Sequence, residues 1–541
     1  MTIPPQTGGM DIEAFRKHGY KVVDQICDYY ARLNELPVVA QVEPGYLVND
    51  LPTEAPKEPE DFSLVASDFQ SKILPGITHW SHPRFFAYFP AITNFESILA
   101  DMMATSVSNP GFNWSCSPAC TELEQVMLDW AAKLLGLQEK FWNSSKQGGG
   151  QITGAASESA IVATVAARER CLRMLSLQGA PEVDENHGLS NNGQSDTSVK
   201  TDELGTRIND ADGDVDDTIR DKYHSKLVMY GSTQTHSIGI KAAKILGLKW
   251  RSLPTFKKDH YALTGETVRK ALEEDEKKGL IPFMLIGTIG TTSTGTVDRL
   301  SEIGQVLKNH PTVFLYIDAA WAGTALAVPE HREALQLDAV NEYADGICTN
   351  FHKWGLVAFD CSALWVRDRK VLTNALDVTP AFLRTKHGDT GLVVDYRNWS
   401  LSLGRRFRSL KLWFVLRSYG VEGFRAHIRK GVQMAAALEK RIRESKDFEL
   451  VTPRSLALLV FRLKPSTGDH TPEQLNELNR RLQELVHAEK DFNMTQTVLP
   501  GEEGQPSIDC MRFAMGALRT TEADAVQAWQ IVERLGASII N

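Results

Sequence analysis

The sequence of 541 residues contains no apolar run that approaches the length of roughly 18 residues that a membrane-spanning helix requires. Its first nine residues also lack the basic region and apolar core of a secretory signal. Both absences argue against a membrane protein and against a secreted one. We therefore expect a cytoplasmic protein that makes no contact with a membrane.

Cysteine is scarce and irregularly placed. The seven cysteines form no CxxC pair, and their odd number argues against a disulfide framework. The lack of a CxxC pair argues equally against a zinc site, so we expect no bound metal. Reduced thiols, most of them buried, are the expectation that follows.

An excess of basic residues is also missing. The net charge is −9, and residues 181–222 account for nearly all of it, with twelve Asp or Glu against four Lys or Arg. The chain therefore has neither the basic footprint of a nucleic-acid-binding protein nor a polybasic membrane patch. Because residues 181–222 also contain no Phe, Trp or Tyr, we expect them to form a disordered insertion.

What the chain does contain is an alternation of short apolar runs and helical patterns. This alternation is typical of an α/β fold in which a mostly parallel sheet is covered by helices. Ligands of such sheets bind where the strands end, so the residues that follow the runs are the functional candidates. The predicted strands are residues 227–230, 283–288, 313–317, 346–348 and 362–366.

The flanking regions have patterns of their own. Helical spacing of apolar residues predicts an amphipathic helix over residues 10–33, and the proline-rich residues 38–60 are typical of an extended arm. Residues 78–90 contain five aromatic side chains and favour a loop that lines a pocket. Alternation at 456–463 and a helix at 522–535 predict a small α+β unit. The chain is therefore divided into an N-terminal helical arm (1–90), a large domain (91–415) and a C-terminal small domain (416–541).

Residues 350–354, Asn-Phe-His-Lys-Trp, place a single lysine between two apolar runs. A lysine forms a Schiff base only after it loses its proton, and burial lowers its pKa from about 10.4. Confinement at the end of a buried strand would have this effect on Lys353. An exposed loop lysine is the ordinary alternative, and the rest of the chain has to decide between the two.

Three further features supply the other parts of a pyridoxal 5′-phosphate (PLP) site. Asp318 ends a predicted strand, where a buried carboxylate needs a cationic partner such as a protonated pyridine nitrogen. The glycine-rich residues 148–158 predict a turn that opens a helix and holds a single phosphate near Ala156 and Ser157. His236 can stack on a ring. Each feature is weak alone, but the set in this order indicates the cofactor.

With these residues in place, the chain resembles the group II PLP-dependent decarboxylases, and within them the aromatic L-amino-acid decarboxylases that act on tyrosine, tryptophan or DOPA. The resemblance extends from about residue 10 to the C-terminus, except for the acidic insertion. It implies PLP-dependent fold type I (aspartate aminotransferase-like) and a homodimer whose N-terminal arm grips the partner and whose active sites lie at the interface. The motifs that carry it are residues 42–47, 82–90, 117–124, 318–320, 350–354, 359–363 and 404–413.

The resemblance also implies roles for individual residues. Lys353 would carry the Schiff base, Asp318 would hold the pyridinium nitrogen, and His236 would stack on the ring. The cofactor surroundings would be completed by Ala156, Ser157, Thr292, Ala320, Asn350 and His352. An aromatic substrate pocket would be formed by Trp80, Tyr88, Phe89, Pro90 and Gly404, together with Phe112 from the partner subunit.

The activity implied is decarboxylation of an aromatic L-amino acid (Trp, Tyr, Phe or DOPA) to an arylalkylamine and CO₂. One residue of the catalytic loop departs from the pattern, because most decarboxylases of the family carry Tyr where this chain has Phe382. A Phe has no proton to give to the carbanion that decarboxylation leaves. Relatives with Phe there tend to be aromatic acetaldehyde synthases, which consume O₂ and release aldehyde, NH₃, CO₂ and H₂O₂.

Aldehyde synthesis is therefore one alternative to amine formation. Another is a non-catalytic binding protein that kept the fold, and the intact Lys353, Asp318 and His236 argue against it. Phe351, where Pro is usual, and Ala91, where a hydroxyl residue is common, affect pocket details without removing the cofactor site. The sequence does not identify the preferred amino acid, the pathway served or the role of the acidic insertion.

Overall fold

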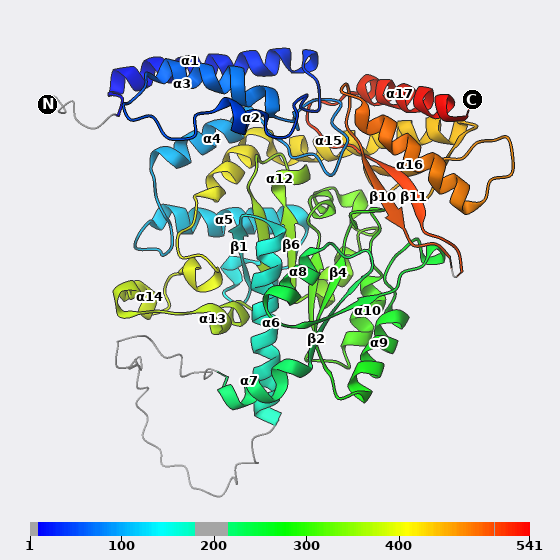
Figure 1. Cartoon of the computed structure of the whole chain (residues 1–541). Coiled ribbons are helices and arrows are strands. Elements are labelled where there is room, and N and C mark those ends of the chain that lie inside the picture. The colour runs from blue at the N-terminus through cyan, green and yellow to red at the C-terminus, as the bar shows by residue number, and fades with distance from the viewer. Residues whose placement is uncertain (1–8, 179–214, 503, 541) are drawn as a thin grey trace, which may run out of the picture.

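The computed structural model describes residues 9–178, 215–502 and 504–540 (Figure 1). Within these residues the chain forms a helical N-terminal segment, a large α/β domain and a small C-terminal α+β unit. None of the helices in these ranges is long and apolar enough to cross a bilayer. All seven cysteines are free thiols, and five of them are buried, as expected.

Most of the expected acidic insertion, residues 181–214, lies outside the described residues. The expectation of disorder is wrong for its last part, because helix α7 begins within it and spans Asp217–Tyr223. The Asp216 side chain begins this helix by accepting a hydrogen bond from the Thr218 N–H. Ile219 then packs against a buried cluster of the large domain, which gives the helix the apolar anchor that the composition alone did not suggest.

A seven-stranded sheet forms the centre of the large domain (Figure 1). Its strands are β1 (Gly149–Thr153), β2 (Leu227–Ser232), β3 (Lys249–Leu253), β4 (Ile281–Thr288), β5 (Phe314–Asp318), β6 (Gly346–Asn350) and β7 (Ser362–Val366). Their order in space is β1-β7-β6-β5-β4-β2-β3. The strands from β6 to β3 run parallel, whereas β7 runs antiparallel to both β6 and β1. The prediction of a mostly parallel sheet is thus confirmed.

Gly149 and Gly150 lie in β1 rather than in a turn, which corrects the prediction for the glycine-rich stretch. β1 is an edge strand that packs closely under large side chains. A Cβ on Gly150 would lie only 2.7 Å from Trp365 Cδ1, so glycine is needed here for close approach. The turn itself is residues 154–155, and helix α6 (Ala156–Gln178) follows it directly.

Helices cover both faces of the sheet. Buried side chains of one strand alternate between two cores, with Leu315 and Ile317 in one and Phe314 and Tyr316 in the other. The second core is shared by α6, α8 (Ile238–Ile245) and α13 (Lys370–Leu376). The first is shared by α5 (Pro118–Leu135), α9 (Gly265–Lys277), α10 (Leu300–Leu307) and α11 (Leu337–Tyr343). The large domain is therefore a three-layer α/β/α structure.

The N-terminal segment is helical, and its helices are α1 (Ile12–Arg32), α2 (Tyr46–Asp50), α3 (Phe62–Asp68) and α4 (Phe95–Ser106). α1 confirms the helix predicted at 10–33, whereas the expected extended arm at 38–60 includes the short α2. Apolar side chains of α1 and α4 stay exposed, among them Phe15 at 65% and Met103 at 55%. The described part of this chain leaves these apolar faces uncovered.

The C-terminal unit contains a four-stranded antiparallel sheet with the order β10-β11-β9-β8. Its elements are β8 (Phe448–Leu450), β9 (Leu458–Leu463), α16 (Pro472–Ala488), β10 (Thr495–Leu499), β11 (Ile508–Ala514) and α17 (Glu522–Ile540). The small α+β unit predicted for this region is thus confirmed. Helix α15 (Arg408–Glu444) joins it to the large domain, and the boundary expected at 415/416 falls inside this helix. Its backbone departs from helical geometry at Gly420 (φ 63°, ψ 178°).

Candidate active site

Three parallel strands end side by side at one edge of the large sheet. Thr288 ends β4, Asp318 ends β5 and Asn350 ends β6, and Thr288 is the register partner of Asp318. A cavity of about 230 Å³ lies at these strand ends. The residues expected from the sequence that line it are Phe89, Ala156, Ser157, His236, Thr292, Asp318, Ala320, Asn350 and Lys353. Ala155, Ile238, Thr288, Gly290 and Trp321 line it as well, and sequence analysis did not single them out.

Lys353 lies on the short helix α12 (Phe351–Trp354), which follows β6 directly. Burial lowers the pKa of its ammonium group, Arg512 adds to the decrease, and Asp318 opposes it. Its Nζ lies 5.5 Å from the centroid of the Phe89 ring. A buried lysine with a lowered pKa has the properties that Schiff-base formation requires.

Asp318 and His236 present fixed polar groups to the same cavity. Asp318 Oδ1 accepts a hydrogen bond from the Ala320 N–H at 3.0 Å, which leaves further acceptor capacity on the carboxylate. His236 Nδ1 accepts a hydrogen bond from the Ile238 N–H at 3.3 Å, so the neutral ring carries its proton on Nε2. Burial lowers the pKa of His236, Asp318 opposes this, and Lys353 reinforces it. The imidazole is therefore neutral at pH 7.

The remaining polar groups of the cavity fit pyridoxal 5′-phosphate. The turn before α6 brings residues 155–157 to the cavity wall, at the start of a long helix with free backbone N–H groups. Asn350 Oδ1 and Thr288 Oγ1 are buried and have no hydrogen-bond partner among the described residues. Both residues line the cavity, so these two atoms are available for hydrogen bonds to a polar ligand there. Asp318 and Lys353 add a partner for a pyridinium and an amine for an aldehyde.

His352, expected beside the phosphate, is not among the residues that line the cavity. Its Nδ1 accepts a hydrogen bond from the Cys361 N–H at 2.8 Å, and its ring packs edge-on against Phe359 with centroids 4.8 Å apart. Burial lowers the pKa of His352 to about 4, and Lys353 contributes to the decrease. Neighbouring residues on a helix point in different directions, so only Lys353 of the two reaches the cavity.

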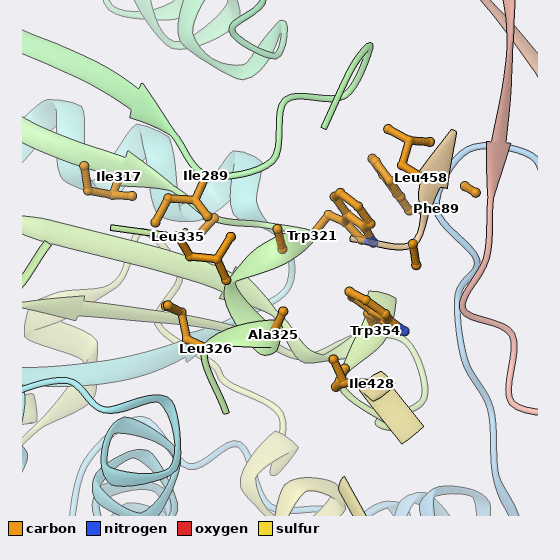
Figure 2. Close-up of a cluster of buried hydrophobic side chains, with 14 of the residues drawn as sticks. Phe89, Ile289, Ile317, Trp321, Ala325, Leu326, Leu335, Trp354, Ile428 and Leu458 are labelled. Carbon is orange, nitrogen blue, oxygen red and sulfur yellow. The ribbon is translucent and has the colours of Figure 1, made fainter. Parts of the chain in front are cut away.

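Phe89 and Trp321 line the cavity, and their rings form an aromatic stack with Trp354, which lies outside it; Figure 2 shows the three side chains. The rings of Phe89 and Trp321 lie 4.2 Å apart at an angle of 16°, and those of Trp321 and Trp354 lie 5.5 Å apart at 14°. Sequence analysis missed Trp321, although its place just beyond Asp318 was a usable signal. A flat apolar wall of this kind suits an aromatic ligand.

Arg512 is a second cation close to Lys353, and no signal in the sequence singled it out. It lies on β11, is only 3% exposed, and its guanidinium carbon lies 4.9 Å from the Phe89 ring centroid. Its Nη1 donates to Thr495 Oγ1 at 3.2 Å and its Nη2 to the Tyr88 carbonyl at 3.4 Å. Burial lowers the pKa of Arg512 to about 10, so the group stays charged at pH 7. A buried guanidinium bound to neutral oxygens attracts anions.

Three of the expected substrate residues, Trp80, Tyr88 and Pro90, do not line the cavity. Trp80 and Tyr88 stack on each other with centroids 5.4 Å apart, and they are 38% and 55% exposed. Pro90, which follows Phe89 in the chain, is buried. Of the aromatic run 78–90, only Phe89 reaches the cavity wall.

Phe112, Gly404 and Phe382 do not line the cavity of their own chain. The carbonyl of Phe112 accepts a hydrogen bond from the Arg397 N–H at 3.0 Å. Gly404 lines a separate hollow of about 450 Å³. Phe382 is 82% exposed on the short turn Ala381–Leu383. In the part of the chain that the structure describes, no group of three or more His, Cys, Asp or Glu side chains is placed to hold a metal ion.

Comparison with known proteins gives one family. The chain matches the pyridoxal-dependent decarboxylase conserved domain over residues 44–199 and 207–464. It is similar to the aromatic-L-amino-acid decarboxylase of Rattus norvegicus, with 40% identity over 533 residues, 98% of this chain and 99% of that protein. It is similar to the phenylacetaldehyde synthase of Arabidopsis thaliana, with 39% identity over 535 residues and 98% of each chain.

Among solved structures, the chain is similar to the crystal structure of Oryza sativa TDC with PLP and tryptamine. The TM-score is 0.86, the identity is 33%, and 100% of each chain is covered. This likeness extends over the central sheet, the N-terminal helices and the C-terminal unit, and the expected fold class is confirmed. The chain therefore belongs to the pyridoxal-dependent decarboxylase family, and it is a carboxy-lyase whose cofactor is pyridoxal 5′-phosphate.

Proposed function

We propose that the protein decarboxylates an aromatic L-amino acid to an arylalkylamine and CO₂, with Lys353 as its Schiff-base lysine. One observation carries this proposal: Lys353, with its lowered pKa, shares a cavity with Asp318 and with the aromatic wall of Phe89 and Trp321. When bound, the cofactor supplies an electron sink for the bond between the α carbon and the carboxylate.

Each polar side chain has a separate task. The neutral amine of Lys353, favoured by burial, anchors the cofactor aldehyde. The Asp318 carboxylate keeps the pyridine nitrogen protonated, because a nearby negative charge favours the cationic form. His236 covers the ring and holds a proton on Nε2. The helix start at residues 155–157 holds the phosphate through backbone N–H groups.

Substrate binding is divided between apolar and charged groups. The stacked rings of Phe89 and Trp321 offer a flat surface to an aromatic side chain. The guanidinium of Arg512 lies over the Phe89 ring and favours an anionic group beside that ring. An amino acid held by both ends keeps its α carbon near Lys353, which is the orientation that decarboxylation requires.

Aldehyde synthesis is the second candidate, and Phe382 is the observation that favours it. A phenyl ring at this loop position has no hydroxyl, so Phe382 gives no proton to the α carbon. His236 Nε2 or water would then have to supply it for an amine to form. In the alternative, the amino acid, O₂ and H₂O yield the aldehyde, CO₂, NH₃ and H₂O₂. The similarity to the rat decarboxylase and to the Arabidopsis synthase is nearly equal and supports either reaction.

We also infer a homodimer in which each subunit completes the site of the other. Support comes from Phe112, Gly404 and Phe382, none of which lines the cavity of its own chain. The exposed apolar faces of α1 and α4 supply a surface that a second copy can bury. The seven free thiols suit a reducing compartment, so we infer a cytoplasmic location.

Product analysis of the purified holoenzyme under air, with L-Trp, L-Tyr, L-Phe and L-DOPA, tests the proposed reaction. Amine and CO₂ in equal amounts, without peroxide, are the expected result. Peroxide and ammonia in amounts equal to CO₂ would show that the reaction is aldehyde synthesis and not amine formation. An absorbance band at about 420 nm that survives in Lys353→Ala would contradict the Schiff-base assignment.

A further inference from the structure

Within residues 9–178, 215–502 and 504–540, β1 pairs with β7 alone, and side chains bind the backbone on the outer side of this edge strand. Every second residue of the strand directs its N–H outward. Two of these donors lie in β1, and each reaches a side-chain oxygen: Gly150 donates to Asn143 Oδ1 at 3.3 Å and Ile152 to Glu124 Oε1 at 2.7 Å. Just beyond the strand, the Gly154 N–H donates to Glu158 Oε2 at 2.8 Å. The edge is thus closed without a further strand.

Ile152 is bound on both of its backbone polar groups by one ion pair. Glu124 accepts from its N–H, and Arg405 Nη2 donates to its carbonyl at 2.9 Å. Arg405 also binds both carboxylate oxygens of Glu124, at 2.6 and 3.0 Å. The two side chains are only 6% and 5% exposed. Burial lowers the pKa of Arg405, but Glu124 raises it by more, so the guanidinium stays charged.

The pair joins two segments that the proposed site needs. β1 ends at Thr153, and residues 155–157 beyond it line the Lys353 cavity. Arg405 directly follows Gly404, and its own N–H donates to the Pro110 carbonyl at 2.6 Å. Its guanidinium carbon also lies 4.6 Å from the ring centroid of Tyr396. A substitution in the pair would therefore displace both the residues at the start of α6 and the segment around Gly404.

We propose that Glu124 and Arg405 are positioning residues, which set residues 155–157, where the turn passes into α6, against the Gly404 segment, so that cofactor affinity depends on a pair that lines no part of the cavity. This inference rests on the proposed role of that turn in holding the phosphate. A guanidinium is required because its planar fork reaches Glu124 and Ile152 together, whereas an ammonium is a single point of charge.

The test compares three variants of the full-length protein. Arg405→Met removes the fork, and Arg405→Lys keeps the charge. Arg462→Met is the matched control, because Arg462 pairs with Glu449 at 2.6 Å on β9, in the C-terminal unit. Two quantities are measured for each apoprotein: the dissociation constant of pyridoxal 5′-phosphate by absorbance titration, and the stability in urea.

We expect Arg405→Met to raise the dissociation constant by about tenfold, because residues 155–157 are then no longer held in the position that binds the phosphate, and Arg405→Lys to recover part of the affinity. Arg462→Met should lose stability but change the dissociation constant by less than about twofold. Equal weakening by the Arg405→Met and Arg462→Met changes would make the pair a general stabiliser and would overturn the proposal.

A fourth variant separates this inference from the proposed function. Ser157→Asp places a negative charge in the turn and should repel the phosphate strongly. If it leaves the affinity unchanged, the turn does not hold the phosphate and the inference fails with it. If Ser157→Asp weakens cofactor binding and Arg405→Met does not, the proposed role of the Glu124–Arg405 pair is wrong, whereas the phosphate site stands. Should Arg405→Met fail to fold, Glu124→Gln provides the same comparison, because its amide oxygen can still accept from the Ile152 N–H.

Discussion

Arg512 and Lys353 lie over the same ring. The guanidinium carbon of Arg512 is 4.9 Å from the Phe89 centroid, and Lys353 Nζ is 5.5 Å from it. The charge of Arg512 lowers the pKa of Lys353, adding to the effect of burial. One arginine on the small unit therefore helps a lysine of the large domain to release its proton, and it attracts an anion to the same place.

Arg512→Gln is expected to weaken substrate binding and to raise the pKa of Lys353. The KM for the amino acid should rise by about tenfold, because the guanidinium that we propose to attract the carboxylate is removed. The pH dependence of pyridoxal 5′-phosphate capture by the apoprotein should shift to higher pH. Arg519→Gln is the control, since Arg519 stacks on Tyr30 in the N-terminal segment. An unchanged KM in Arg512→Gln would mean that the carboxylate is held elsewhere.

A mixed dimer tests whether Phe382 acts on the partner subunit. One chain carries Lys353→Ala together with Phe382→Tyr, and the other is unchanged, so the only working lysine faces an altered loop from its partner. If the loop acts across the interface, the ratio of amine to aldehyde should rise above that of the unchanged dimer. The reciprocal dimer, with Phe382→Tyr on the chain that keeps Lys353, should show no rise. The opposite pattern would place the loop over the cavity of its own chain.

His352 should make the protein less stable in mild acid. Its pKa is about 4 in the folded chain, against about 6.5 in an unfolded one, so the unfolded state binds more protons between these values. Stability from this group is therefore complete above pH 6.5 and declines as the pH falls towards 4. We expect the free energy of unfolding, measured in urea, to fall between pH 7 and pH 4.5 by about 2 kcal/mol less in His352→Gln than in the unchanged protein. The exposed His487, replaced in the same way, should follow the unchanged protein.

Gly150→Ala is expected to destabilise the edge strand. The added methyl group would lie 2.7 Å from Trp365 Cδ1 and 2.8 Å from the Leu364 carbonyl, which forces β1 away from β7. Overpacking of this kind costs about 1–3 kcal/mol. Gly19→Ala is the control, because a methyl group added there would have no neighbour within 4 Å, and the substitution should stabilise α1 by about 0.5–1 kcal/mol. If Gly150→Ala left the free energy of unfolding unchanged, β1 would be able to shift away from Trp365 without cost.

Much of the site followed from order along the chain. Asp318 and Lys353 each follow an apolar run, and parallel strands bring such positions to one edge of a sheet, so their shared cavity was predictable. Orientation was not predictable in the same way. His352 adjoins Lys353 but is held by the Cys361 N–H, a contact that depends on how β7 returns beside β6.

Other residues escaped prediction because their signals were ambiguous or distant. The glycines at 149 and 150 were interpreted as a turn, since no local pattern reveals that Trp365 lies over them. Arg512 belongs to another sheet and approaches Lys353 only through the packing of the C-terminal unit. Phe112 and Phe382 were placed at the substrate by resemblance, and one chain by itself does not bring them there.

The pairing of β1 with β7 has a consequence for the order of events during synthesis. β1 leaves the ribosome first among the strands of its sheet, yet β7, its one strand partner in the described part of the chain, leaves last. Until β7 has been made, β1 has no strand to pair with. Its glycines also give it little local preference for strand structure. The cofactor therefore meets a finished site only after the whole large domain has been made, and a ribosome stalled before β7 would release a chain unable to retain it.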